Sequence, residues 1–270
     1  MDPLSSRLWR TAGLQVPARL PILCYHATPQ NRTQIKSKYD VSADSLARHL
    51  DLLADSGWTT ITLEALRRRV PLPPRAIMLT FDDGYANNLA GAFELLKKRD
   101  MHATWFIATA HVGGGARHSG VSTFDHPTLS AGDLQALHAG GMAVGSHTAS
   151  HRSLLSLSHS EIHEELLASK LWLEDLLSTR VDSIAYPYGS YNEAAISIAR
   201  EIGFELGFTT RSGVNSLETP RLEFRRLTIF SDDDVARFAR KLSLADNDAS
   251  WVKLMQYGFR SIVRRIRRRP

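Results

Sequence analysis

Short apolar runs alternate with amphipathic helical patterns along almost the whole chain. The run PILCY at residues 21–25 precedes a helical pattern at 42–57, and AIMLTF at 76–81 precedes one at 85–100. The alternation continues through ATWFIAT, MAVGSH, SIAYPYG, FELGFTT and FRRLTIF to a last helical pattern at 231–242. Such alternation predicts a parallel sheet covered by helices. About seven units in a single α/β domain favour a closed or nearly closed, distorted (β/α) barrel, with an open doubly wound sheet as the alternative.

Two adjacent carboxylates, Asp82 and Asp83, follow the apolar run 76–81 directly. The run has the pattern of a buried strand, which ends at this acidic pair and the glycine behind it. In parallel α/β folds, functional sites are built where the strands end. Taken alone, however, an Asp-Gly step after a strand is more often only a turn.

A second motif, SHTASH, places His147 and His151 four residues apart just beyond the predicted strand MAVG. On one turn of helix, residues with this spacing share a face, and two imidazoles so placed can bind one metal ion. Asp82 or Asp83 would supply a third, carboxylate ligand from the end of another strand. The sequence therefore predicts a metal site with positions left open for water and substrate.

The chain contains a second histidine pair with the same spacing, His159 and His163. This pair opens a long helical pattern, has Ser and Glu as neighbours, and has no strand in front of it. We interpret it as a solvated helix face. Spacing alone is therefore a weak signal, and position at the end of a strand separates the two pairs.

Three motifs together make the chain resemble the polysaccharide deacetylases of carbohydrate esterase family 4. TFDDGY, SHTASH and AYPYG (185–189) follow the family's order, and HATWFIAT and IGFELGFTT also resemble it. The resemblance covers about residues 21–243. It implies a distorted (β/α) barrel and an enzyme that hydrolyses N-acetyl groups with a divalent metal ion.

The resemblance also implies a role for each motif residue. Asp83, His147 and His151 would be the metal ligands, with zinc as the expected ion and cobalt, nickel, manganese or iron as alternatives. Asp82 would be the general base that takes a proton from the attacking water. The peptide N–H of Tyr188 would donate to the developing oxyanion. Two roles for two carboxylates would explain the doubled aspartate.

The chain departs from the family's pattern at two positions. Ala185 stands where an arginine commonly orients the base, and Arg225 or Arg226 is the candidate replacement. Phe230 stands where a late acid histidine is expected. In a family branch that acts on exported poly-N-acetylglucosamine, the acid histidine lies instead on the first strand, after a tyrosine. The sequence CYH here therefore predicts His26 as the general acid, against the alternative of a structural histidine at a strand end.

The basic charge of the chain is concentrated near its C-terminal end. The formal net charge is +5, and residues 260–270 read RSIVRRIRRRP, without which the chain is close to neutral. A nucleic-acid-binding core is therefore not expected. We divide the chain into an N-terminal arm at 1–20, a catalytic barrel at 21–245 and a basic amphipathic tail at 246–270. The tail predicts either an interfacial helix on an anionic membrane surface or a helix packed on the barrel.

The sequence shows no signal peptide and no run of 18 apolar residues, so a location in the cytoplasm or peripheral to the membrane is expected. The expected partner is a glycan that contains N-acetylhexosamine, either poly-N-acetylglucosamine-like or a lipid-linked sugar. Two alternatives stay open: a catalytically silent carbohydrate-binding barrel, and a hydrolase of a small non-peptide amide. The oligomeric state is not predicted by these patterns.

Overall fold

Parallel strands form the centre of the molecule, as the alternation predicts. The computed structural model describes residues 20–114, 124–216, 218–250 and 253. Its sheet has the order β7-β6-β5-β4-β3-β1-β8, with β2 beside the start of β3 and every neighbouring pair parallel. The strands are β1 (Ile22–Tyr25), β2 (Thr59–Thr60), β3 (Ala76–Phe81), β4 (Thr104–Ile107), β5 (Ala143–Ser146), β6 (Ser183–Ala185), β7 (Leu206–Phe208) and β8 (Leu227–Thr228).

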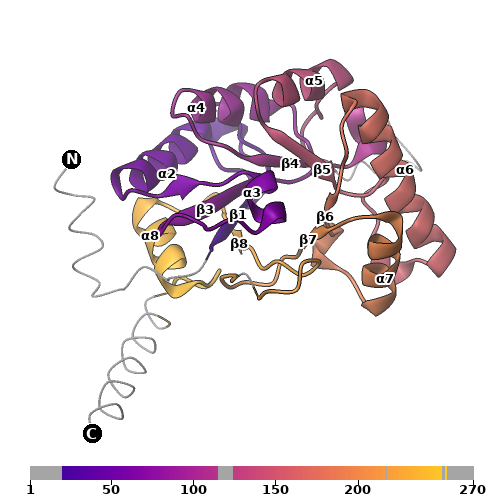
Figure 1. Ribbon diagram of the computed structural model, residues 1–270. Helices are drawn as coiled ribbons and strands as arrows, with labels where there is room; N and C mark the ends of the chain where they lie inside the picture. The colour runs from indigo at the N-terminus through magenta and orange to yellow at the C-terminus, as the bar shows by residue number, and fades with distance from the viewer. Residues whose placement is uncertain (1–19, 115–123, 217, 251–252, 254–270) are drawn as a thin grey trace, which may run out of the picture.

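The two edges of the sheet approach each other through the segment 224–228. Phe224 forms an isolated parallel bridge with Phe208 of β7, and the Arg226 N–H donates to the Arg211 carbonyl. Residues 227–228 then pair with β1. The sheet is thereby curved into the distorted barrel that the sequence predicts, with helices around its outside (Figure 1).

The helices that cover the sheet begin at polar capping residues. Ser42, Ser130, Ser158, Asn192 and Asp234 each accept a backbone N–H in the first turn, which satisfies a donor that the helix leaves free. These residues precede α2 (Ala43–Asp55), α5 (Ala131–Ala139), α6 (His159–Leu177), α7 (Glu193–Ile202) and α8 (Val235–Leu244); α4 spans Glu94–Lys97. Among the described residues, no helix combines the length and apolar character needed to cross a membrane.

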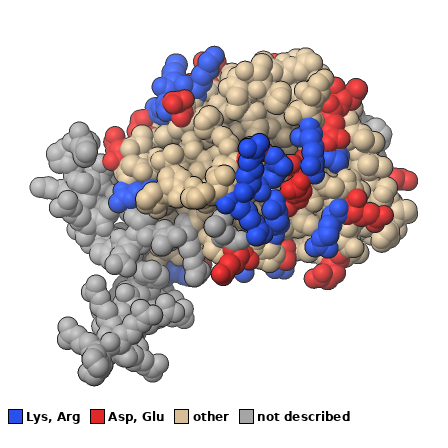
Figure 2. Space-filling model, viewed as in Figure 1, with Lys and Arg blue, Asp and Glu red and all other residues tan. Residues whose placement is uncertain are grey.

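The core has two parts because side chains alternate along each strand. In β1, Leu23 and Tyr25 face the outer helices, whereas Ile22 lies in a second cluster inside the barrel. Helix α3 (Leu63–Arg68) contributes Leu66 to this inner cluster and so closes the barrel at the end where the strands begin. Lys and Arg side chains gather over α3 in Figure 2, where Arg67 and Arg68 form ion pairs with Glu64 of the same helix.

The chain after β3 is helical but begins with a π-helical turn at Leu89–Phe93. A Cβ on Gly91 would lie 1.9 Å from the Thr28 carbonyl oxygen, so only glycine allows the loop after β1 to lie this close. The Thr28 N–H and hydroxyl donate to the side chains of Asn87 and Asn88. These contacts fix the loop that begins at His26 against the segment that follows β3.

The expectations for the N-terminal arm and for most of the basic tail fall outside the described residues. Residues 1–19, 251–252 and 254–270 are not described. Residues 246–250 are described, and Ala249 is buried, with its carbonyl accepting a hydrogen bond from Arg240.

Candidate active site

The predicted site residues come together because the carboxyl ends of neighbouring strands are in register. Tyr25 of β1 pairs with Phe81 of β3, so His26 and Asp82, the next residue on each strand, lie at the same edge. Ser146 pairs with Ile184 of β6, and His147 follows directly. Residues far apart in the sequence therefore meet at the end of the barrel opposite α3, as expected for a parallel α/β fold.

The predicted metal ligands form one compact group. The Asp83 Oδ1 atom lies 3.4 Å from His147 Nε2 and 3.2 Å from His151 Nε2, and all three residues are buried. Burial alone would raise the pKa of Asp83, but the two imidazoles outweigh it and hold this pKa well below its usual value. The carboxyl group is therefore ionised and available as a ligand.

The hydrogen bonds around this group fit a bound cation. His147 Nδ1 lies 2.7 Å from the Ala185 carbonyl oxygen, which can only accept, so this nitrogen carries the proton. Burial would lower the pKa of His147, but the charges of Asp82 and Asp83 outweigh it and raise this pKa, so without a metal ion a proton on Nε2 is favoured as well. In the form that binds a cation, Nε2 is unprotonated and its lone pair points toward Asp83, whose Oδ1 has no hydrogen-bond donor among the described residues. Two acceptors that face each other are stabilised by a cation between them. Two imidazoles and one carboxylate are a donor set typical of a divalent ion such as zinc at a catalytic site with open positions.

The local backbone around the histidines differs from the helical turn that the spacing suggested. Residues 147–151 are irregular, and the helical premise is wrong, because Thr148 and His151 have positive φ angles of 65° and 59°. Asp83 and Tyr188 also have positive φ, at 72° and 59°. Non-glycine residues rarely adopt this conformation, which often occurs where a site requires a particular side-chain direction. The imidazoles thus converge through a tight loop.

A buried ion pair holds the second aspartate. Arg226 Nη1 donates to Asp82 Oδ1 and Nη2 donates to Oδ2, both at 2.7 Å. Burial would raise the pKa of Asp82, but the charge of Arg226 outweighs it and lowers this pKa. Of the two candidate replacements for the arginine missing at Ala185, Arg226 is the one that contacts Asp82, whereas Arg225 donates to the Ser212 carbonyl near the surface. Asp82 is therefore an ionised, oriented carboxylate beside the predicted metal ligands.

His26 lies beside this carboxylate. A ring nitrogen of His26, the Cys24 sulfur and an oxygen of Asp82 all lie within 4.8 Å of one another. His26 Nδ1 is buried and has no hydrogen-bond partner among the residues that the structure describes. Burial lowers the pKa of His26, while the nearby aspartates act in the opposite direction. The ring is thus placed where it can exchange a proton with a group in the cleft, and the thiol of Cys24, whose pKa burial raises, stays protonated next to Asp82.

These residues open into a cleft of about 510 Å³. This volume falls within the range of about 300–1,000 Å³ that is common for small-molecule pockets. Sequence reasoning found six of its lining residues. Of those it missed, Tyr85 lies in the motif TFDDGY and Thr228 lies on β8, whereas most of the others come from segments without a motif. The lining is His26, Ser37, Tyr39, Asp40, Asp82, Asp83, Tyr85, Asp125, His147, His151, Tyr188, Thr210, Thr228, Phe230 and Asn247.

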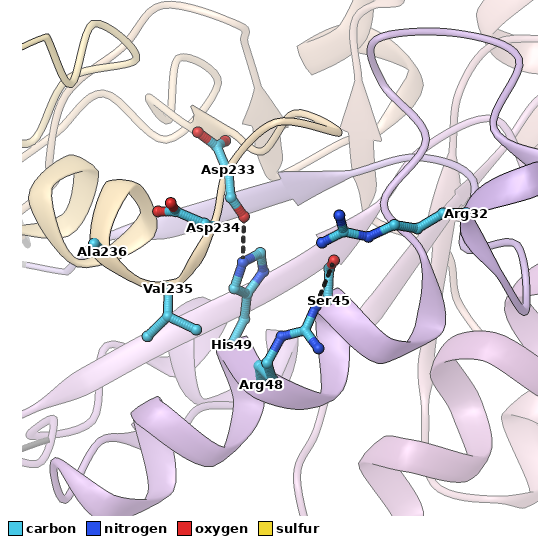
Figure 3. Close-up of a pocket in the computed structure, with 8 residues that line it drawn as sticks. All are labelled: Arg32, Ser45, Arg48, His49, Asp233, Asp234, Val235 and Ala236. Carbon is cyan, nitrogen blue, oxygen red and sulfur yellow. Dashed lines mark hydrogen bonds between the residues drawn. The ribbon is translucent and has the colours of Figure 1, made fainter. Parts of the chain in front are cut away.

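The second histidine pair with a spacing of four residues, His159 and His163, lies on the first turns of α6 and does not line this cleft. A separate pocket lies between α2 and the start of α8 (Figure 3). It contains His49, whose Nε2 is 2.8 Å from the Asp233 carbonyl oxygen. Because none of the predicted catalytic residues lines that pocket, it is not part of the candidate site.

Comparisons with known proteins agree with this geometry. Residues 69–207, which are 139 of the 270 residues, match the family model described as polysaccharide deacetylase. The Bacillus subtilis protein YxkH is 28% identical over 218 residues, covering 79% of this chain and 72% of that protein. The Staphylococcus aureus poly-beta-1,6-N-acetyl-D-glucosamine N-deacetylase is 25% identical over 183 residues, covering 63% of this chain and 61% of that enzyme.

A solved structure extends the similarity to the fold. The Streptococcus pyogenes deacetylase PplD, in complex with acetate, superposes with a TM-score of 0.73 and 26% sequence identity. The superposition covers 84% of this chain and 99% of that one. The fold is therefore shared with that deacetylase along most of the described chain.

Proposed function

Because this chain belongs to the polysaccharide deacetylase family, whose members hydrolyse N-acetyl amide bonds, we propose that it removes acetyl groups from an N-acetylhexosamine glycan by metal-dependent hydrolysis. The observation that carries the proposal is the pairing of two adjacent aspartates with different partners. Asp83 faces two imidazoles, and Asp82 is held by Arg226. One carboxylate can thus serve as a ligand while its neighbour serves as a base.

Each step of the reaction can be assigned to a residue of the cleft. Asp83, His147 and His151 would hold the divalent ion. That ion, when bound, lowers the pKa of water and polarises a carbonyl group. Asp82 takes a proton from the water whose oxygen bonds to the acetyl carbon. The carbonyl oxygen becomes an oxyanion, toward which the Tyr188 N–H is the proposed donor.

The second half of the reaction needs a proton on nitrogen. The carbon–nitrogen bond breaks only if the departing amine is protonated, and His26 is the proposed donor. Its nearness to Asp82 supports a route by which the proton from water reaches the amine. One water proton reaches the nitrogen through Asp82 and His26, and the second passes from the new carboxylic acid to the amine. The products are acetate and the protonated amine of a hexosamine, so atoms and charge balance.

The proposed substrate is a poly-N-acetylglucosamine-like polymer or a lipid-linked sugar. The name of the Staphylococcus aureus relative supports a β-1,6-linked polymer. We further propose that the arginine-rich tail brings the enzyme to an anionic membrane surface. Deletion of residues 251–270 should then weaken co-sedimentation with anionic vesicles and spare turnover of soluble substrate; equal co-sedimentation would remove the membrane role.

Acetate release from a glycan panel tests the proposed function. The panel contains β-1,6- and β-1,4-linked N-acetylglucosamine oligomers, assayed by acetate release, and a small cyclic imide, assayed by ring opening. Each is assayed after chelation and again after addition of zinc, cobalt, nickel, manganese or iron. We expect acetate from at least one oligomer, lost on chelation and restored by metal. Binding of oligomers without acetate release would favour a silent carbohydrate-binding barrel, and turnover of the imide alone would favour a small-amide hydrolase.

A further inference from the structure

Exposed aromatic side chains are concentrated at the cleft. Among the described residues, six large apolar side chains are exposed: Tyr39, Val70, Leu155, Leu171, Trp172 and Tyr188. Three of these are aromatic, and two of the three, Tyr39 and Tyr188, line the cleft. Tyr39 is 38% exposed although its ring contacts those of His26 and Phe230. Exposed aromatic surface in a cleft is a frequent sign of a ligand.

Tyr39 is part of an aromatic wall on one side of the cleft. Its ring centroid lies 4.9 Å from that of the proposed acid His26 and 5.7 Å from that of Phe230. The Lys38 ammonium lies 5.0 Å from the centroid of the Tyr39 ring. The wall therefore combines ring surface with a hydrogen-bond donor next to the reacting groups.

A buried carboxylate fixes the loop that carries Tyr39. Asp40 accepts hydrogen bonds from the Lys36 N–H and the Ser37 hydroxyl, both at 2.7 Å, and lies 2.7 Å from His126 Nε2. Burial would raise the pKa of Asp40, but these partners, His126 first, outweigh it and lower this pKa. The loop is thereby tied to the segment around His126 on another part of the rim. Tyr39 is thus held in place before any ligand binds.

A second buried carboxylate fixes Phe230. Asp233 accepts the Phe230 N–H at 2.7 Å and forms a buried ion pair with Lys241. The Asp233 carbonyl in turn lies 2.8 Å from His49 Nε2 of α2 (Figure 3). Both ends of the aromatic wall are therefore held in place by buried carboxylates.

We propose that Tyr39 and Phe230 form a binding subsite for a pyranose ring next to the hexosamine that is deacetylated. The apolar C–H face of a sugar packs on aromatic rings, and its hydroxyl groups can accept from Lys38. The subsite makes an oligosaccharide of at least two units the preferred substrate over a single acetylated sugar. This inference rests on the proposed function and names the length class of its substrate.

Turnover on substrates of increasing length tests the subsite. The substrates are an aryl acetate ester and N-acetylglucosamine oligomers of one to five units, and the variants are Tyr39→Ala, Tyr39→Phe, Phe230→Leu and Trp172→Ala. Trp172 is a matched control, because it is 37% exposed and lies on α6, outside the cleft. We expect Tyr39→Ala to raise KM roughly tenfold for oligomers of two or more units, equivalent to about 1.4 kcal/mol, and less than twofold for the ester.

The remaining variants separate stacking from folding. Tyr39→Phe keeps the ring and should stay close to the unchanged enzyme, Phe230→Leu should raise KM with the same dependence on length, and Trp172→Ala should change nothing. A KM for oligomers that is unchanged in both Tyr39→Ala and Phe230→Leu would overturn the subsite, as would an equal rise in KM for the ester.

Calorimetric binding of the pentamer to the chelated protein makes the subsite testable apart from the reaction. We expect roughly tenfold weaker binding in Tyr39→Ala. If the protein releases no acetate but binds the pentamer in this Tyr39-dependent way, the proposed function fails and the subsite stands. If the protein is active and the pentamer binds equally well to Tyr39→Ala, the subsite fails and the proposed function stands.

Discussion

Arg226 donates a hydrogen bond of 2.7 Å to each carboxylate oxygen of Asp82, which lies 144 residues earlier in the sequence, and both side chains are buried. Two further hydrogen bonds fix the arginine in turn. Nη1 donates to the Thr80 hydroxyl at 3.1 Å, and Nε donates to the Thr209 carbonyl at 2.9 Å. The guanidinium group therefore sets the direction of Asp82 and keeps it ionised. Among the described residues, the neighbouring Asp83 forms its ion pairs with the imidazoles of His147 and His151 rather than with an arginine.

Replacement of Arg226 should damage both folding and turnover. Arg226→Met leaves the buried Asp82 charge unpaired and should lower the free energy of unfolding by about 3–5 kcal/mol. Because Arg226 lowers the pKa of Asp82, its loss raises that pKa, so the acidic limb of kcat/KM should move to higher pH. Arg226→Lys should fold better but still lose the paired geometry. The Arg225→Met control should keep the stability, the turnover and the pH profile of kcat/KM. An unchanged pH profile in folded Arg226→Lys and Arg226→Met would contradict the assignment of Arg226 as the group that lowers the pKa of Asp82.

The two histidine pairs allow a test of metal binding at constant spacing. His147→Ala and His151→Ala should each lose bound metal, because each removes one of three ligands from a buried group. His159→Ala and His163→Ala, with the same spacing on α6, should retain it. Elemental analysis of the four purified variants decides the matter. Full occupancy in His147→Ala would show that the ion binds elsewhere.

His26 should matter more for an amide than for an ester. His26→Ala removes the proposed proton donor, so turnover of the acetylated oligomer should fall by roughly 10²–10⁴-fold while metal content stays normal. An aryl acetate ester has a leaving group that needs little protonation and should be much less affected. Comparison of the two losses in the same variant is the measurement. Equal losses would indicate a positioning role, and unchanged amide turnover would remove His26 from the mechanism.

His49 should make the protein less stable as the pH falls. Burial lowers the pKa of His49 from 6.5 to about 4, so the unfolded chain binds this proton at a higher pH than the folded protein does. The part of the free energy of unfolding that depends on a neutral, buried His49 is fully present above pH 6.5. It is lost as the pH falls toward 4, by about 3 kcal/mol at most. Urea unfolding of the unchanged protein and of His49→Gln at pH 7.5, 6, 5 and 4 measures the difference in slope. A difference that is constant with pH would contradict this assignment.

The sequence predicted the groups that lie at strand ends and missed those that loops bring in. Asp82, Asp83 and His147 follow buried apolar strands, so their placement depends on register alone. The helical turn inferred for residues 147–151 was wrong, because spacing of four residues does not distinguish a helix from a loop with positive φ angles. The choice between Arg225 and Arg226 also needed the structure, because it depends on which of two adjacent side chains points into the barrel.

No pattern in the sequence predicts that Tyr39 and Phe230 form an aromatic wall. Tyr39 and Phe230 lie on loops and meet only because Asp40 and Asp233 fold those loops inward. Asn247 likewise reaches the cleft from the segment that follows α8, where its Oδ1 accepts the Thr228 N–H at 2.8 Å. Contacts of this kind depend on tertiary packing, which neither periodicity nor motif spacing encodes.

The two adjacent aspartates are proposed to have different roles, Asp83 as a metal ligand and Asp82 as the base. Metal content and acetate release, measured on the same preparations, test this most directly. Asp83→Asn should lose the ion and turnover together, because a ligand charge is removed from the group. Asp82→Asn should keep the ion at full occupancy and lose turnover by roughly 10²-fold or more, because the base is removed and no ligand is lost. Near-normal acetate release from Asp82→Asn with its ion bound, or loss of the ion from that variant, would contradict the account.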